Sequence, residues 1–289
     1  MDMPELIYPS VQMPLFFFVS GTFYHAKSST LFGQLKSDAY KLILPALVFS
    51  LFAYVIGKSM GAMNGSVYEN VINSLSASIV WFLIALFYFR TIAYCCVCKG
   101  RSIVILLISL VLYVPGYYLY AKGMYWVLPF LPLSHMGTFM IWFALGLQVG
   151  GQILKLITSS NAKLITLFIA AAVLYIIVVH MIDWNVGILS HIPWLLYGFP
   201  YTFGVIFVMI VIAKKVEKVA LLIPANRFLS YIGRNSIVFY LTHWPLWIYV
   251  FKQLGWNKYL AFLLIVLLEV PLIYIFNHYL PWCIGKTKK

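Results

Sequence analysis

Apolar residues fill most of the chain in long runs, and short stretches between the runs hold nearly all of the charged residues. A helix needs roughly 20 apolar residues to cross about 30 Å of bilayer hydrocarbon. Membrane barrels would instead show shorter segments that alternate apolar and polar side chains. The pattern therefore predicts nine membrane-spanning helices, the first of them short, over 13–24, 40–57, 75–97, 102–120, 135–153, 163–181, 194–213, 229–251 and 259–280.

Composition supports this interpretation and excludes a soluble domain. The chain is 63% hydrophobic and 9% charged, with a mean hydropathy of +0.95, whereas soluble domains are about half apolar and a quarter charged. No linker, repeat or low-complexity segment divides it. We therefore expect an all-α integral membrane protein, a polytopic helical bundle in which residues 1–289 form one membrane-embedded domain.

Lysine and arginine predict the orientation, because cytoplasmic loops hold the excess of these residues. When the loops are taken alternately, fourteen fall on one side and four on the other. The larger set is Lys27, Lys36, Lys41, Lys99, Arg101, Lys155, Lys163, Lys214, Lys215, Lys218, Arg227, Lys286, Lys288 and Lys289, and the smaller is Lys58, Lys122, Lys252 and Lys258. We predict a cytoplasmic C-terminus and, with nine spans, an N-terminus outside. Topology and anionic-lipid contact then explain the net charge of +13 without a nucleic-acid partner.

The residues before the first span do not form a signal peptide. The stretch MDMPELIYPS has neither a basic start nor an apolar core. Because an outside N-terminus without such a signal is unusual, we expect a further span upstream.

Six phrases, in this order, resemble the acyltransferase family 3 membrane proteins, in the branch that includes sugar O-acetylases. They are QMPLFFFVSGTFY, KLILPALVFSL, VWFLIALF, FMIWFALGLQVG, GRNSIVFYLTHWPL and NHYLPWCIGK, from Gln12 to Lys286. The resemblance implies ten spans with both ends cytoplasmic, which is the predicted topology plus one helix. It also implies a plasma (inner) membrane enzyme that moves an acyl group, usually acetyl, from cytoplasmic acyl-CoA to a hydroxyl of a cell-surface glycan or similar acceptor. Acyl-CoA is then a donor substrate, and no bound cofactor is expected.

Such a transfer needs a general base for the hydroxyl proton, a role that suits histidine. The resemblance places the base on the family's first span and a second histidine just before MPLFFF, where this chain has Gln12. Glutamine forms hydrogen bonds but is no general base. Asp38 and Lys41 stand where the family carries Arg-x-x-Arg. We therefore expect the chain as given to be inactive, unless the base lies elsewhere.

His243 is the next candidate for the catalytic base. It lies about fifteen residues past the cytoplasmic start of its predicted span, in the outer half of the bilayer. Ionisable residues inside a membrane usually face an interior cavity; the alternative is a neutral histidine bonded to a neighbouring helix. We interpret His135, His180, His191 and Asp183, near the outer ends of spans, as interfacial side chains that meet water.

Two arginines are candidates for binding the phosphates of CoA. Arg90 and Arg234 lie near the cytoplasmic ends of their predicted spans, where a guanidinium binds phosphate bidentately. The alternative is that they reach lipid phosphates. Gln12, Trp81 and Asn235 are candidates for the acceptor pocket; Trp81 would stack on a sugar or belong to the aromatic belt at the membrane surface.

Two short motifs concern metal binding and packing. Cys95, Cys96 and Cys98 in CCVC lack the paired spacing of a structural zinc site, so no metal is expected. Gly146 and Gly150 form a G-x-x-x-G that predicts a close approach of two helices.

Two other functions stay open from the sequence. One is a transporter or flippase for a lipid-linked sugar, and the other is a non-catalytic, truncated relative of the enzymes. Substrate flux without consumption of acetyl-CoA would favour the transporter.

Overall fold

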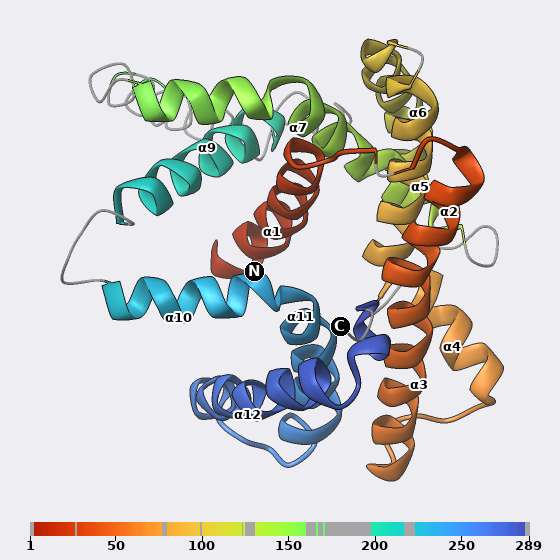
Figure 1. Ribbon diagram of the computed structural model, residues 1–289. Coiled ribbons are helices and arrows are strands. Elements are labelled where there is room, and N and C mark those ends of the chain that lie inside the picture. The colour runs from red at the N-terminus through yellow and green to blue at the C-terminus, as the bar shows by residue number, and fades with distance from the viewer. Residues whose placement is uncertain are drawn as a thin grey trace, which may run out of the picture. The chain divides into compact units, whose positions relative to one another are not determined.

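The computed structural model describes residues 3–26, 28–76, 80–98, 100–122, 124, 131–159, 166, 170, 198–216 and 223–286. Within these residues the regular elements are all helices (Figure 1), which confirms the predicted all-α class. The α-helices are α1 Met3–Thr22, α2 Leu31–Asp38, α3 Leu44–Ser59, α4 Val67–Ser76, α5 Trp81–Val97, α6 Ser102–Ala121, α7 Leu133–Ser159, α9 Gly198–Val216, α10 Ile223–Arg234, α11 Ser236–Leu246 and α12 Lys258–His278. Wider π-helical turns, η1 Ala39–Ile43 and η4 Trp247–Phe251, continue α2 and α11, and the 3-10 turn η5 Pro281–Ile284 follows α12.

Three helical stretches within the described residues are long and apolar enough to cross a membrane. They are Leu31–Ser59, Leu133–Lys155 and Tyr259–His278. Four shorter apolar helices are Trp81–Val97, Ser102–Gly116, Thr202–Lys214 and Ser236–Phe251. The protein is thus a helical membrane protein, while the number of nine spans stays a prediction. The predicted span 163–181 lies outside the described residues, apart from positions 166 and 170.

The first helix begins ten residues earlier than the predicted span, at Met3 instead of residue 13. Pro4 lies in its first turn, where a missing N–H costs no intrahelical hydrogen bond. Hydropathy marks only the apolar part of a helix, whereas backbone hydrogen bonds continue through its polar part. Gln12 therefore lies in the middle of α1 and is half-buried.

The predicted span 229–251 is divided into two helices. Asn235, with φ −114° and ψ 19°, is not helical and separates α10 from α11. His243 is consequently the eighth residue of α11, about 10 Å from the start of that helix. The expected position of His243 in the outer half of the bilayer stays a prediction, since it depends on where the membrane lies along α11.

The predicted span 75–97 is shortened at its beginning. Val80, with φ −117° and ψ 7°, precedes α5, which begins at Trp81. Residues 75 and 76 belong to α4 instead, and residues 77–79 lie outside the described residues.

One compact unit comprises Met1–His25, Lys99–Tyr118 and Gly137–Asn226. In this unit a Cβ on Gly146 of α7 would overlap the backbone of Phe18 on α1, and a Cβ on Gly150 would overlap the side chain of Thr22. The glycines thus let the two backbones approach closely, as the G-x-x-x-G predicted. Helix α1 also contacts α9, where Phe18 meets Phe203 edge to face.

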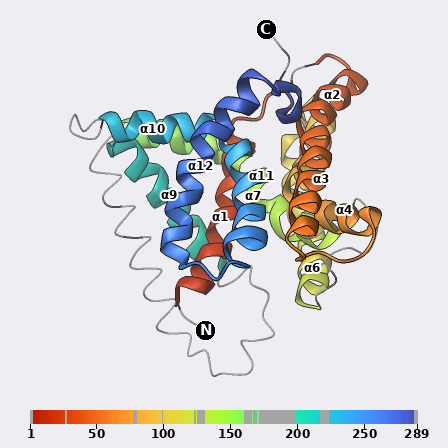
Figure 2. The ribbon, with the colours of Figure 1, turned by 90° about the horizontal axis from the view of Figure 1, so that it is seen from below.

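The second compact unit comprises Ala26–Cys98, Leu119–Met136 and Arg227–Lys289. Within it α3 contacts α4, α11 and η5, while α2 and η1 contact α5. Helices α11 and α12 run side by side (Figure 2). Its buried core includes Phe49, Phe82, Phe89 and Leu241. These contacts bring the start of α11, the end of α12 and the turn η5 together.

Candidate functional site

Asn235 is the centre of a hydrogen-bonded group where α11 begins and α12 ends. Its Oδ1 accepts from Nδ2 of Asn277 at 2.8 Å and from Nζ of Lys286 at 3.4 Å. Lys286 Nζ also donates to Oδ1 of Asn277 at 2.6 Å, and Nδ2 of Asn235 donates to the carbonyl of Tyr231 at 2.8 Å. Asn235 is buried and therefore needs these partners. We call Asn235, Asn277 and Lys286 the amide-lysine cluster.

Gly285 explains how Lys286 reaches this cluster. Its φ is +66°, a conformation that side chains with a Cβ rarely adopt. A Cβ there would also lie only 2.6 Å from Cα of Lys41. The hydroxyl of Tyr40 donates to the carbonyl of Lys286 at 3.3 Å. The C-terminal turn is thereby held against η1, and Lys286 is directed to Asn235 and Asn277.

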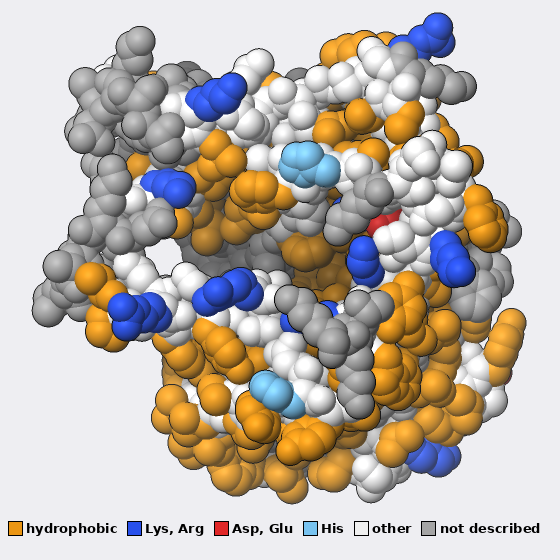
Figure 3. Space-filling model, viewed as in Figure 1, with side chains coloured by type: hydrophobic (Ala, Val, Ile, Leu, Met, Phe, Trp, Pro, Cys, Tyr) orange, Lys and Arg blue, Asp and Glu red, His pale blue; other side chains and the backbone are white. Residues whose placement is uncertain are grey.

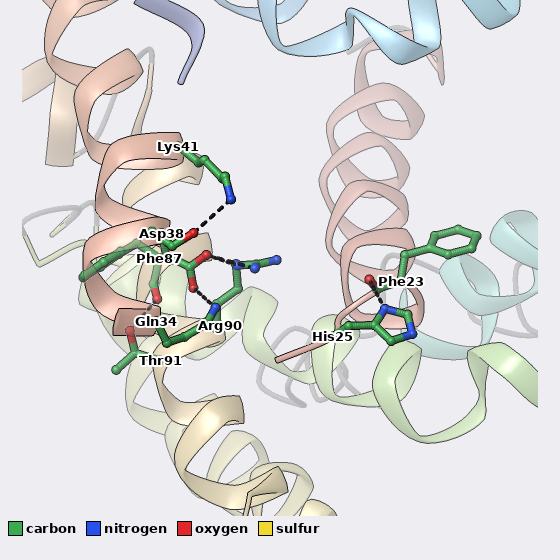
Figure 4. A network of polar contacts seen from close by, with 9 residues as sticks. Phe23, His25, Gln34, Asp38, Lys41, Phe87, Arg90 and Thr91 are labelled. Atoms are coloured by element: carbon green, nitrogen blue, oxygen red, sulfur yellow. Dashed lines mark hydrogen bonds and ion pairs between the residues drawn. The ribbon is translucent and has the colours of Figure 1, made fainter. Parts of the chain in front are cut away.

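Arg90 forms an ion pair with Asp38 (Figure 4). Its Nη2 and Nε lie 2.9 and 3.0 Å from Oδ1 of the carboxylate, and Nε2 of Gln34 donates to Oδ2 at 2.7 Å. Asp38 is buried, so this partner compensates for the loss of water. The carboxylate that departs from the family's arginine pattern is therefore matched by the arginine predicted to bind CoA.

Arg234 differs from Arg90 in being exposed at the end of α10. Its Nε donates to the carbonyl of Ser230 at 3.3 Å, a bond that orients the side chain along its own helix. Arg234 is the residue directly before Asn235 in the chain. Arg234 and Lys286 thus place two cations at the same end of α11.

His243 is half-buried on α11 and has a defined ring orientation. Its Nδ1 lies 2.7 Å from the carbonyl oxygen of Phe239, and its ring stacks on that of Phe239 with centroids 5.4 Å apart. Because a carbonyl only accepts, Nδ1 carries the proton in the neutral ring and Nε2 carries the lone pair. His243 lies eight residues after Asn235, about 12 Å along the helix.

The rings of Trp81 and His135 lie against each other, tilted by 32°. Their ring centroids are 4.0 Å apart, and both side chains are buried. His135 therefore does not meet water as expected, because the first turn of α7 packs against the start of α5. One face of Trp81 is covered by the imidazole. His180, His191 and Asp183 lie outside the described residues.

Thr242 and Glu269 form a buried pair that was not predicted from the sequence. The hydroxyl of Thr242 is hydrogen-bonded to Oε1 of Glu269, which is 1% exposed on α12. Oε2 of Glu269 has no hydrogen-bond partner within the described residues. The signal was visible, because Glu269 interrupts the apolar run FLLIVLLEVPLIYIF, and a carboxyl inside a membrane helix is a functional candidate.

The predicted site residues divide between the two compact units. Arg90, Trp81, Arg234, Asn235 and His243 belong to the second unit, whereas Gln12 belongs to the first. No group of three His, Cys, Asp or Glu side chains suited to a metal ion occurs in the described part of the chain.

Comparison with known proteins gives the family. A search of curated proteins and a search of solved structures each returned no significant match. The family model described as an acyltransferase domain matches residues 10–285, almost the whole chain. The match includes α11 with His243, Asn235 and Asn277 of the amide-lysine cluster, and the pair of Asp38 with Arg90. The chain therefore belongs to acyltransferase family 3, and it is a helical membrane protein of that family.

Proposed function

We propose that the protein is a membrane O-acyltransferase of the plasma membrane, which moves an acetyl or similar acyl group from cytoplasmic acyl-CoA to a hydroxyl of a cell-surface glycan. The family match supports acyl transfer. The observation that carries the mechanism is the layout of α11. Two cations lie at its start, and a histidine oriented for proton transfer lies about 12 Å farther along.

The donor phosphates bind at the start of α11 in this proposal. Arg234 is exposed and can adjust its position to a phosphate, whereas the amino group of Lys286 is held in place by the amide oxygens of Asn235 and Asn277. Both cations can bind phosphate oxygens. Arg90 is assigned a different role, since its guanidinium already holds the Asp38 carboxylate. CoA carries its thioester at the far end of a long arm, so the acyl carbonyl lies deeper along α11.

The proton is transferred through His243. Nε2 takes the proton from the acceptor hydroxyl while the hydroxyl oxygen attacks the thioester carbonyl. The carbon–sulfur bond then breaks, and the CoA sulfur leaves with the proton that His243 returns. Trp81 is proposed to contact the acceptor, while the role of Gln12 stays a prediction from the sequence. Asn235 is assigned to the donor site and not to the acceptor pocket, because its side-chain amide is hydrogen-bonded to Tyr231, Asn277 and Lys286.

The test measures transfer of labelled acetyl groups from acetyl-CoA to surface glycan in membranes that contain the full chain. His243→Gln should lower the rate roughly 10²- to 10⁴-fold, the usual cost of losing a general base. His278→Gln is the matched control. His278 is exposed, but its Nδ1 bonds the carbonyl of Tyr274 at 3.0 Å and its ring stacks on Tyr274, as His243 does with Phe239.

Three results would contradict the proposal. Equal transfer by membranes with the wild-type protein and by membranes without it would show that the protein has no acyltransferase activity. Movement of glycan across the membrane without consumption of acetyl-CoA would identify a transporter. An equal loss of transfer rate in His243→Gln and His278→Gln would show that His243 is not the general base. Protein levels are measured in every membrane, so that a loss of folding is distinguished from a loss of catalysis.

A further inference from the structure

Helix α10 has two chemically different faces. Arg227, Ser230 and Arg234 follow the i, i+3, i+7 spacing and lie on one side of the helix. Phe228 and Ile232, one turn apart, lie on the opposite side. Arg227 and Arg234 are the charged residues of the helix, and both are basic. This division is typical of helices that lie in a membrane surface.

The apolar side of α10 is exposed at Phe228, whose side chain is 44% accessible to solvent. A large exposed aromatic side chain costs free energy in water but not at the boundary of the acyl chains. Arg227 is exposed as well. Figure 3 shows basic side chains along α10.

The position of α10 along the membrane normal follows from its connection to α11. Asn235, directly after α10, is hydrogen-bonded to Asn277 in the last two turns of α12 and to Lys286. These polar partners mark the end of two apolar helices, where hydrocarbon gives way to headgroups. Helix α10 lies across that end of α11 and α12 (Figure 2). A helix placed there lies at the depth of the headgroups.

We propose that α10 is a surface-bound helix that docks on an anionic lipid leaflet. Phe228 and Ile232 enter the boundary of the acyl chains, and Arg227 binds lipid phosphate with its long side chain. The basic polar face selects an anionic surface over a neutral one, since the negative surface potential of an anionic leaflet attracts arginine side chains that lie near it. Docking fixes the start of α11 at a constant depth, whether or not the chain transfers acyl groups.

The test measures the depth of spin labels in the full chain, reconstituted in nanodiscs after its native cysteines are replaced. Phe228→Cys and Ser230→Cys place labels on opposite faces of the same helix. The label at 228 should be more accessible to oxygen than to a water-soluble nickel reagent, and the label at 230 should show the reverse. Equal nickel accessibility at both positions, or protection of position 228 from both reagents, would overturn the docking.

A second arm tests the charge. Nanodiscs of phosphatidylcholine are compared with nanodiscs that contain equal parts of phosphatidylcholine and phosphatidylglycerol. The label at 228 should lie deeper with phosphatidylglycerol, and Arg227→Gln should abolish that difference. The same response with and without Arg227 would show that this residue does not select anionic lipid. Arg234 stays unchanged in this arm, because it is proposed to bind the donor.

Discussion

At the scale of single residues, the buried carboxylate of Asp38 makes the protein depend on Arg90. Replacing Arg90 by glutamine leaves a buried charge without its cation, a change that typically costs about 3–5 kcal/mol. We expect Arg90→Gln to lower the unfolding temperature of the purified protein clearly. The double variant Asp38→Asn with Arg90→Gln should recover most of that loss, because no buried charge remains. A double variant as unstable as the single one would contradict the pairing.

Lys286 should make the binding of the acyl donor depend on pH. Partial burial lowers the pKa of its amino group from the ordinary lysine value of about 10.4. Only the protonated amine binds phosphate, so donor binding should weaken as pH rises through the lowered pKa, at a lower pH than for a lysine with the ordinary pKa. Lys286→Arg stays protonated and should lose this pH dependence.

The measurement for Lys286 is KM for acetyl-CoA from neutral to alkaline pH. Charge-assisted hydrogen bonds contribute about 1.5–3 kcal/mol, so Lys286→Gln should raise KM roughly 10- to 100-fold at neutral pH. If KM for acetyl-CoA depends on pH in the same way in the wild type and in Lys286→Arg, Lys286 does not bind the donor.

At the scale of elements, the contact of α1 with α7 depends on Gly146. A methyl group there would overlap the carbonyl of Phe18, and separating the helices should cost about 1–3 kcal/mol. Gly151→Ala is the matched control on the same helix, since a Cβ there meets nothing within 4 Å. We expect Gly146→Ala to lower the unfolding temperature and Gly151→Ala to keep or slightly raise it. Equal effects would contradict the close approach.

The helices also show where local patterns mislead. Hydropathy over 229–251 suggested one span, but the sequence GRNS contains a non-helical Asn235 that ends α10 and starts α11. Leu229 and Ile232 belong to an amphipathic helix, and averaging over a window hides the polar residues between them. The boundaries of α6 and α12, in contrast, differ from the predicted spans by at most two residues.

At the scale of the whole molecule, the prediction is the orientation in the membrane. The excess of fourteen basic residues over four predicts a cytoplasmic C-terminus. Single cysteines introduced at Lys122 and Lys252, with the native cysteines replaced, should react with a membrane-impermeant thiol reagent in intact cells. A cysteine at Lys215 should react only after the cells are opened. Labelling of Lys215 in intact cells would reverse the orientation.

The sequence by itself determined the helical class, the membrane location and the family, because each depends on residues that are close together in the chain. Apolar runs, the G-x-x-x-G and the ordered phrases are all local patterns. The tertiary structure alone decided the partners of the site residues. Asp38 meets Arg90 52 positions away, and Asn235 meets Asn277 and Lys286 42 and 51 positions away. Such pairs form only when packed helices bring distant segments together, so Arg90 became the partner of a buried carboxylate and Asn235 the centre of the cluster that holds Lys286.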